Sequence, residues 1–218
     1  MKRGLLIDIE GVDASGKTTQ LERLIKRMSE VEWVERDRGV TSFAFPRYDT
    51  PVGQAIKRHP QLSHERYARP AITGEDDALS FEALMLMDKV EAACEIERSL
   101  SFGTHVVTGR WAASALAYGS YSGHDLKWLE RLYALLPRPD LTLLIDVDPE
   151  LAVNRRPGYR DRYESNRHRQ HHVRKMYLKM CAAQPGWVLI DGAHPVDDVA
   201  HQIWEQVWLL LGRHRSLP

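Results

Sequence analysis

Short apolar runs alternate with longer amphipathic stretches along the 218 residues of the chain. Runs rich in Val, Ile and Leu predict buried strands, and stretches with apolar residues at helical spacing predict helices. The predicted strands are residues 5–9, 42–45, 105–108, 141–147 and 187–190, and the main helical stretches begin near residue 18 and cover 78–100, 112–136 and 197–211. This alternation predicts an α/β fold with a five-stranded parallel sheet flanked by helices.

The segment 59–77 interrupts this alternation. It contains Pro60, Pro70 and Gly74 among mixed charges, which favours a surface excursion with little helix of its own. The chain length suits one ordinary domain, so we expect residues 1–218 to form a single domain. Within the long helix that follows, we expect Met85, Met87 and Cys94 to face the core or a pocket.

Composition and charge exclude several classes of protein. Lysine plus arginine equals aspartate plus glutamate at 30 each, so no net positive field would hold a nucleic acid. The two cysteines, Cys94 and Cys181, fall in predicted helices and indicate no disulfide framework, which favours the cytoplasm. Asp8 and Glu10 interrupt the first apolar run, so we expect no signal peptide, and no run is long enough for a membrane span.

A phosphate-binding loop follows the first predicted strand. Residues 10–19 match the pattern of Gly, four residues, Gly, Lys and Ser or Thr, and they lie between a strand and an amphipathic helix as this loop requires. Gly11 and Gly16 bring amide N–H groups close to phosphate oxygens, Lys17 reaches the β- and γ-phosphates, and the Thr18 hydroxyl binds Mg²⁺. Ala14, Ser15 and Thr19 complete the predicted ATP site.

Three further segments carry arginine or carboxylates where the sheet would open to a ligand. They are 45–48, 109–111 and the arginine-dense stretch 155–164. Phosphoryl transfer between two anionic substrates needs cations on both sides, and Arg47 and Arg110 follow predicted strands. Residues 155–164, with their closely spaced arginines, predict a lid that closes over the transferring phosphate.

The order of these motifs resembles the thymidylate kinase family. The matching segments are the P-loop at 10–20, Phe-Pro-Arg at 45–47 with Thr-Pro-Val-Gly at 50–53, Arg110 and Trp111 with Ser114, Ala117 and Tyr118, Pro-Arg-Pro-Asp-Leu at 137–141, and Asp-Arg-Tyr-Glu at 161–164 with Gln170, Val173, Arg174 and Tyr177. The resemblance implies a three-layer P-loop kinase fold, ATP with Mg²⁺ as the donor, a deoxynucleoside monophosphate as the acceptor, most simply dTMP, and a homodimer.

The resemblance also implies roles for individual residues. Since Ala14 replaces an arginine found in the P-loop of some members, the catalytic arginine is expected in the lid, with Arg160 the first choice. Arg155 matches the residue that stacks on adenine. The implied catalytic residues are Lys17, Arg110, Arg160 and Asp13, and the implied metal site is Thr18, Asp13 and Glu164. The implied acceptor site is Asp13, Phe45, Pro46, Arg47, Tyr48, Met85, Lys89, Arg110, Ser114, Tyr118, Asp161, Tyr163 and Glu164.

The chain departs from the family pattern at several of these positions. Gly109 replaces an aspartate next to Arg110, Met85 and Lys89 replace a base-stacking Phe and a base-binding Arg, and Gly119 replaces a frequent glutamine. A different or modified deoxynucleoside monophosphate and a non-catalytic nucleotide-binding homologue therefore stay open as alternatives. A nucleoside kinase needs fewer arginines for an acceptor phosphate, and a guanine-nucleotide switch needs an Asn-Lys-x-Asp element that the sequence lacks.

Overall fold

The predicted strands form one parallel sheet in the computed structural model, which describes residues 2–36, 38–59, 75–155 and 167–216. The strands are β1 (Leu6–Glu10), β2 (Val40–Ala44), β3 (His105–Gly109), β4 (Leu141–Asp146) and β5 (Trp187–Asp191), in the spatial order β2-β3-β1-β4-β5. The prediction of a five-stranded parallel sheet is confirmed, with strand ends shifted by one or two residues.

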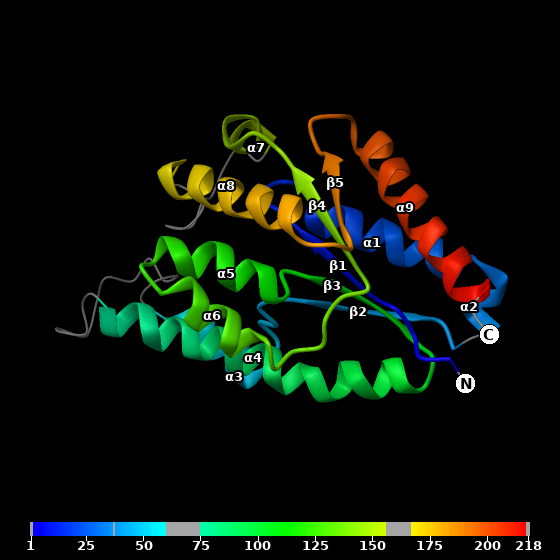
Figure 1. The fold of residues 1–218 in the computed structure, drawn as a ribbon, viewed down its shortest axis with the longest axis horizontal. Coiled ribbons are helices and arrows are strands. Elements are labelled where there is room, and N and C mark those ends of the chain that lie inside the picture. Colours follow the sequence, from blue (N-terminus) through cyan, green and yellow to red (C-terminus); the bar gives the residue numbers. More distant parts are fainter. Residues whose placement is uncertain (1, 37, 60–74, 156–166, 217–218) are drawn as a thin grey trace.

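Helices cover both faces of the sheet and make three layers (Figure 1). One layer contains α1 (Lys17–Ser29) and α9 (Val196–Ser216), which contact each other and the sheet, with α2 (Glu32–Arg36) beside α1. The other layer contains α4 (Glu75–Ser101), α5 (Ala112–Tyr121) and α8 (Arg167–Ala183), and α6 (Leu126–Tyr133) packs on α5. α3 (Pro51–Arg58) packs on α4, and α7 (Pro149–Arg155) packs on α8.

The hydrophobic pattern explains which strands lie at the centre. Every residue of β1 and β3 is buried, as expected for strands covered by helices on both faces, whereas the edge strands β2 and β5 are partly exposed. On α1, Leu21, Leu24 and Met28 are buried against the sheet at the spacing that the sequence predicts. The first βα turn is therefore fixed between a fully buried strand and a packed helix.

Several local features differ from the sequence predictions. The long helix begins at Glu75, so the last three residues of the segment 59–77 are helical, and residues 60–74 lie outside the described part. The short helices α2 and α3 were not predicted. α3 begins after Thr50, whose Oγ1 accepts a hydrogen bond from the Gly53 N–H at 3.0 Å, and Pro51 occupies its first turn.

Two residues of α4 lie on the surface instead of in the core. Met87 is 55 % exposed and Cys94 is also exposed, so the prediction that both face the core or a pocket is wrong. The helix carries apolar residues nearly all round, including Leu84, Met85 and Leu86, and this removes the periodicity that would identify a single buried face.

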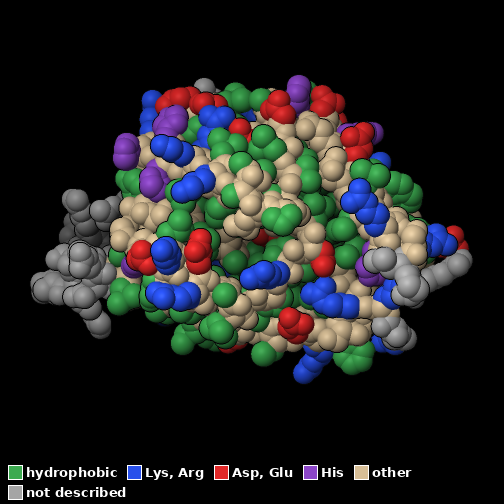
Figure 2. Space-filling view, in the orientation of Figure 1, with side chains coloured by type: hydrophobic (Ala, Val, Ile, Leu, Met, Phe, Trp, Pro, Cys, Tyr) green, Lys and Arg blue, Asp and Glu red, His purple; other side chains and the backbone are tan. Residues whose placement is uncertain are grey.

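Charges of both signs are interspersed on the surface. Figure 2 shows Lys, Arg, Asp and Glu side chains mixed over the face seen in Figure 1, in agreement with the zero formal net charge of the sequence. Within the described ranges, no helix has the length and apolar character that crossing a bilayer would need.

Candidate active site

The P-loop connects β1 to α1 and holds Lys17 against its own backbone. Gly11 has φ 151°, and a Cβ at this position would lie 2.6 Å from the Ile145 carbonyl oxygen, so only glycine fits here. The Lys17 ammonium donates hydrogen bonds to the carbonyl oxygens of Gly11 at 2.9 Å and Val12 at 2.6 Å. The loop is closed around the lysine at the N-terminus of α1, where backbone N–H groups and the helix dipole favour phosphate.

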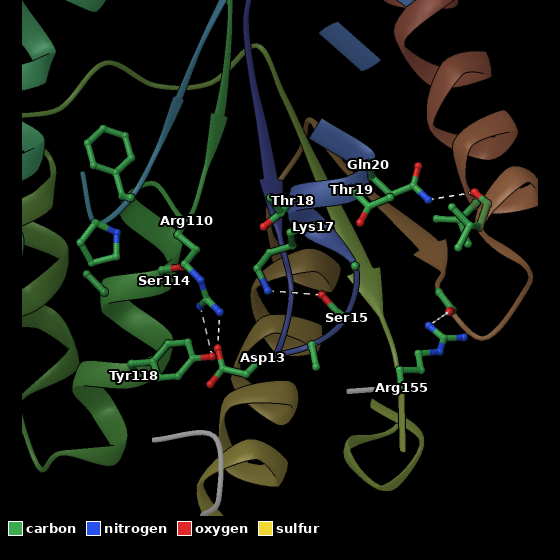
Figure 3. Close-up of a pocket in the computed structure, with 18 of the residues that line it drawn as sticks. Asp13, Ser15, Lys17, Thr18, Thr19, Gln20, Arg110, Ser114, Tyr118 and Arg155 are labelled. Atoms are coloured by element: carbon green, nitrogen blue, oxygen red, sulfur yellow. Dashed lines mark hydrogen bonds and ion pairs between the residues drawn. The ribbon is translucent and has the colours of Figure 1, made fainter. Parts of the chain in front are cut away.

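Asp13, at the tip of the P-loop, joins three other elements. Its carboxylate forms an ion pair with Arg110 at the end of β3 and accepts a hydrogen bond from Gln170 Nε2 of α8 at 2.6 Å. Its backbone N–H donates to Gln170 Oε1 at 3.1 Å, and Arg110 Nη1 donates to the Tyr118 hydroxyl of α5 at 3.3 Å. Arg110 and Tyr118 both point toward Asp13 (Figure 3). The structure therefore brings together Asp13, Arg110 and Tyr118, and adds Gln170, for which the sequence analysis gave no role.

The charges in this cluster are stabilised by one another. Burial alone would raise the pKa of Asp13, but the positive charges of Arg110 and then Lys17 outweigh it and lower this pKa to about 2. Burial and the nearby Asp13 carboxylate raise the pKa of the Tyr118 hydroxyl. Asp13 is therefore ionised and Tyr118 neutral at neutral pH, and the Arg110 guanidinium stands beside both.

The cavity beside this cluster has a volume of about 1070 Å³ and extends to both sides of the P-loop. On the Arg110 side it is lined by Phe45, Pro46 and Tyr48 after β2, by Phe81, Glu82 and Met85 of α4, and by Ser114, Ala115 and Tyr118 of α5. On the other side it is lined by Gln20, Arg155, Val199 and residues 192–196. Figure 3 shows Arg110 and Arg155 on opposite sides of the loop. The cavity can therefore hold two ligands whose phosphates meet at the P-loop.

Arg47 is not among the residues that line the cavity, and its guanidinium is held by carboxylates of α4. Its Nε donates to Asp88 Oδ1 at 2.8 Å, and its Nη2 donates to Glu91 Oε2 at 2.7 Å. Asp88 Oδ2 also accepts the Arg47 backbone N–H at 3.0 Å. These contacts hold the segment after β2 against α4, and the residues on either side of Arg47, Pro46 and Tyr48, reach the cavity.

The two predicted base-contacting residues of α4 differ in position. Met85 lines the cavity, whereas Lys89 is fully buried and is not among the lining residues. The Lys89 ammonium lies 5.5 Å from the Phe45 ring centroid and 5.8 Å from that of Tyr133, and burial lowers its pKa. Lys89 therefore supports the cavity wall from behind in this structure.

Ser114 connects the cavity wall to a buried carboxylate. The Glu10 side chain, at the end of β1, accepts hydrogen bonds from the Ser114 N–H at 3.1 Å, the Ser114 hydroxyl at 2.7 Å and the Tyr177 hydroxyl at 2.8 Å. Nearby, burial and then the charge of Glu10 raise the pKa of Asp8, which accepts from Thr108 Oγ1 at 2.9 Å. This network ties the P-loop strand to α5 and α8.

On the donor side, the predicted residue Arg155 contacts a loop, residues 192–196, that no sequence motif identified. Arg155, at the end of α7, donates to the carbonyl oxygens of Gly192 at 2.6 Å and Ala193 at 3.0 Å. Gln20 Nε2 donates to the Val196 carbonyl oxygen at 2.9 Å. Loop 192–196 contributes backbone groups to the site. Their position depends on tertiary packing, so the sequence does not predict that this loop lies at the site.

Four predicted site residues fall outside the described part of the chain. They are Arg160, Asp161, Tyr163 and Glu164. Of the predicted P-loop residues, Ala14, Ser15, Gly16, Thr18 and Thr19 all line the cavity. At Gly109, an added Cβ would lie 3.3 Å from Leu21 Cδ1, so α1 packs closely against the position where the family resemblance implies an aspartate.

Comparison with known proteins agrees with this geometry. The family model for thymidylate kinase matches residues 9–203. Thymidylate kinase of Dictyostelium discoideum is 30 % identical over 203 residues, which are 93 % of this chain and 84 % of the relative, and thymidylate kinase of Danio rerio is 28 % identical over 203 residues, covering 93 % and 89 %. The solved structure of thymidylate kinase from Candida albicans superposes with a TM-score of 0.74 at 25 % identity, covering 97 % of this chain and 94 % of that one. The chain therefore belongs to the thymidylate kinase family and is a nucleoside monophosphate kinase with the P-loop kinase fold.

Proposed function

We propose that this protein transfers the γ-phosphate of ATP to dTMP and releases dTDP and ADP. The observation that carries the proposal is the continuous cavity of about 1070 Å³, which has the P-loop lysine between an Arg155 side and an Arg110 side. Two nucleotides bound end to end in this cavity would meet at Lys17, where charge develops during transfer. Membership of the thymidylate kinase family supports dTMP as the acceptor.

On the donor side, the P-loop residues from Gly11 to Thr19 would bind the ATP phosphates. The Lys17 ammonium would exchange its contacts with the loop carbonyl oxygens for contacts with the β- and γ-phosphates. Arg155 would stack on the adenine ring, because its guanidinium already lies along loop 192–196 at the edge of the cavity.

Magnesium fits the donor set around the Thr18 hydroxyl. The Thr18 side chain lines the cavity next to Lys17, at the N-terminus of α1. This suits Mg²⁺, which keeps several waters and takes most of its remaining ligands from substrate phosphates. Thr18, Asp13 and Glu164 are the proposed protein contributors, directly or through water, and the ion would neutralise phosphate charge as it develops.

On the acceptor side, Arg110 would hold the dTMP phosphate, with Asp13 and Tyr118 fixing its orientation. Arg47 would assist after a change of partner from Asp88, and Phe45, Pro46, Tyr48, Met85 and Ser114 would enclose the nucleoside. Lys89 is proposed to support the base-binding wall. Arg160 remains our proposed catalytic arginine, and Asp161, Tyr163 and Glu164 remain proposed acceptor contacts.

Another deoxynucleoside monophosphate is the second candidate acceptor. The replacements at Met85, Lys89 and Gly119 favour it, since they change the wall that would contact the base. The test is ADP formation from ATP and Mg²⁺ with dTMP, dUMP, dCMP, dAMP, dGMP or thymidine as the acceptor. Preference for dTMP supports the proposal, preference for another monophosphate supports the second candidate, and ATP binding without any turnover would contradict both.

We also propose that the protein forms a homodimer through α4 and works in the cytoplasm. Leu79, Met87 and Val90 of α4 are 49 %, 55 % and 42 % exposed, and their spacing places them on one side of the helix with Cys94. Sedimentation of the wild type should give a mass twice that of the monomer. Val90→Lys should reduce the measured mass to that of a single monomer. The two cysteines are free, in keeping with a reducing compartment.

A further inference from the structure

Glu82 places a carboxyl group in the wall of the cavity next to the proposed base site. It belongs to α4, is 5 % exposed, and lines the cavity together with Phe81, Met85 and Phe45. The neighbours on this wall are apolar, and burying a carboxylate among them is costly unless it is paired or hydrogen-bonded. A buried carboxyl group facing a ligand cavity is therefore a candidate for recognition of a polar group on the ligand.

The contacts of Glu82 fix one oxygen and leave the other for a ligand. The Tyr133 hydroxyl of α6 donates to Oε1, and among the described residues none donates to Oε2. Burial raises the pKa of Glu82 above its ordinary value, and the hydrogen bond from Tyr133 and the nearby Lys89 and His124 offset only part of this rise. Tyr133 thus orients the carboxyl group without using its full capacity to accept hydrogen bonds.

The glycine at position 119 of α5 leaves room for this carboxyl group. A Cβ added at Gly119 of α5 would lie 3.3 Å from Glu82 Oε2 and 2.9 Å from Leu129 Cδ1. A longer side chain at position 119 would therefore enter the space that the carboxyl group occupies. Gly119 and Glu82 fit together, so that a polar group reaches this part of the cavity from α4 instead of from α5.

We propose that Glu82 determines pyrimidine specificity, accepting a hydrogen bond at Oε2 from the N3–H of thymine in the acceptor. This inference rests on the proposed phosphorylation of dTMP. Thymine presents a donor at N3, whereas cytosine presents a lone pair there, which finds no donor at the acceptor oxygen of Glu82. Met85 and Phe45 would cover the ring while Glu82 reads its edge.

The test compares dTMP with dCMP in the full-length protein carrying Glu82→Met or Glu82→Gln. Methionine keeps most of the volume and accepts no comparable hydrogen bond, so the KM for dTMP should rise about 10- to 100-fold, as expected when the buried N3–H of thymine is left without an acceptor. The KM for ATP and the kcat/KM for dCMP should change little. Glutamine keeps an acceptor oxygen and should recover much of the dTMP affinity. Its NH₂ group can also donate to cytosine N3, so the ratio of kcat/KM for dCMP to kcat/KM for dTMP should rise.

A structural role for Glu82 predicts a different pattern. If Glu82 only joins α4 to α6, both substitutions should raise the KM for dTMP, dCMP and ATP alike. Tyr133→Phe should then have the same effect. That result, or an unchanged ratio of kcat/KM for dCMP to kcat/KM for dTMP in the Gln variant, would overturn the inference and leave the proposed function intact. Failure of the wild type to phosphorylate dTMP would overturn both.

Discussion

Replacing Asp13 with asparagine tests whether the charge cluster at the P-loop stabilises the fold as well as the site. Asparagine keeps the shape of the side chain and removes the charge that pairs with Arg110. It also presents an NH₂ group to Gln170 Nε2, which donates to Asp13 Oδ2 in the wild type. We therefore expect Asp13→Asn to lower both the free energy of unfolding and the turnover number.

The pKa of Asp13 gives the magnitude. The value falls from 3.8 to about 2 in the folded protein, and the Asp13 side chain is only 13 % exposed. At 1.36 kcal/mol per unit, the ionised carboxylate contributes about 2 kcal/mol. Because the pKa is lowered by folding, this contribution is fully present above about pH 5 and is lost as the pH falls from about 4 toward 2.

Urea unfolding followed by tryptophan fluorescence measures this contribution. The chain has six tryptophans, and Trp111 is fully buried, so unfolding should change the signal. At pH 7, Asp13→Asn should be about 2 kcal/mol less stable than the wild type, and the difference should narrow toward pH 3. Asp198→Asn, at an exposed position of α9, is the matched control and should change stability by less than about 0.5 kcal/mol.

Equal stability of Asp13→Asn and the wild type at pH 7 would refute the reasoning. So would a difference that widens as the pH falls, because the lowered pKa requires the opposite sign.

Three further substitutions test other parts of the site. Lys17→Ala should reduce kcat by at least about 100-fold, since it removes a positive charge from the transferring phosphate, and near-normal turnover would contradict the proposed P-loop role. Arg155→Ala should raise the KM for ATP by about 5- to 30-fold with little change for dTMP, and an equal effect on both substrates would argue against stacking on adenine. Tyr177→Phe removes the 2.8 Å hydrogen bond to Glu10 and should lower Tm by about 4–8 °C for a loss of about 2 kcal/mol. An unchanged Tm in calorimetry would show that the buried Glu10 does not need this donor.

The sequence predicts the parts of the site that depend on local order. The P-loop lies between a strand and a helix that are adjacent in the chain, so its motif and its surroundings can be read together. The same holds for Arg110, which directly follows β3. The strand pattern similarly predicts the sheet, because short runs rich in Val, Ile and Leu alternate with helical stretches, as in a buried parallel sheet.

Residues that reach the cavity through tertiary packing could not be predicted in this way. Glu82 reads as an ordinary polar residue of a long helix, and its importance depends on the positions of Tyr133 and Gly119 on two other helices. Loop 192–196 contributes backbone oxygens to Arg155, so side-chain identity carries no signal. Met87 and Cys94 were misplaced because α4 is apolar on several faces, and hydrophobicity alone cannot tell which face packs.

Transfer of labelled phosphate is the most direct test of the central claim that one cavity joins the ATP γ-phosphate to dTMP. Purified protein would be given Mg²⁺, dTMP and ATP labelled at the γ-phosphate, and the products would be separated by chromatography. The account predicts label in dTDP with the wild type and its loss with Lys17→Ala. Label released as inorganic phosphate, or retained in ATP while dTMP binds, would contradict it.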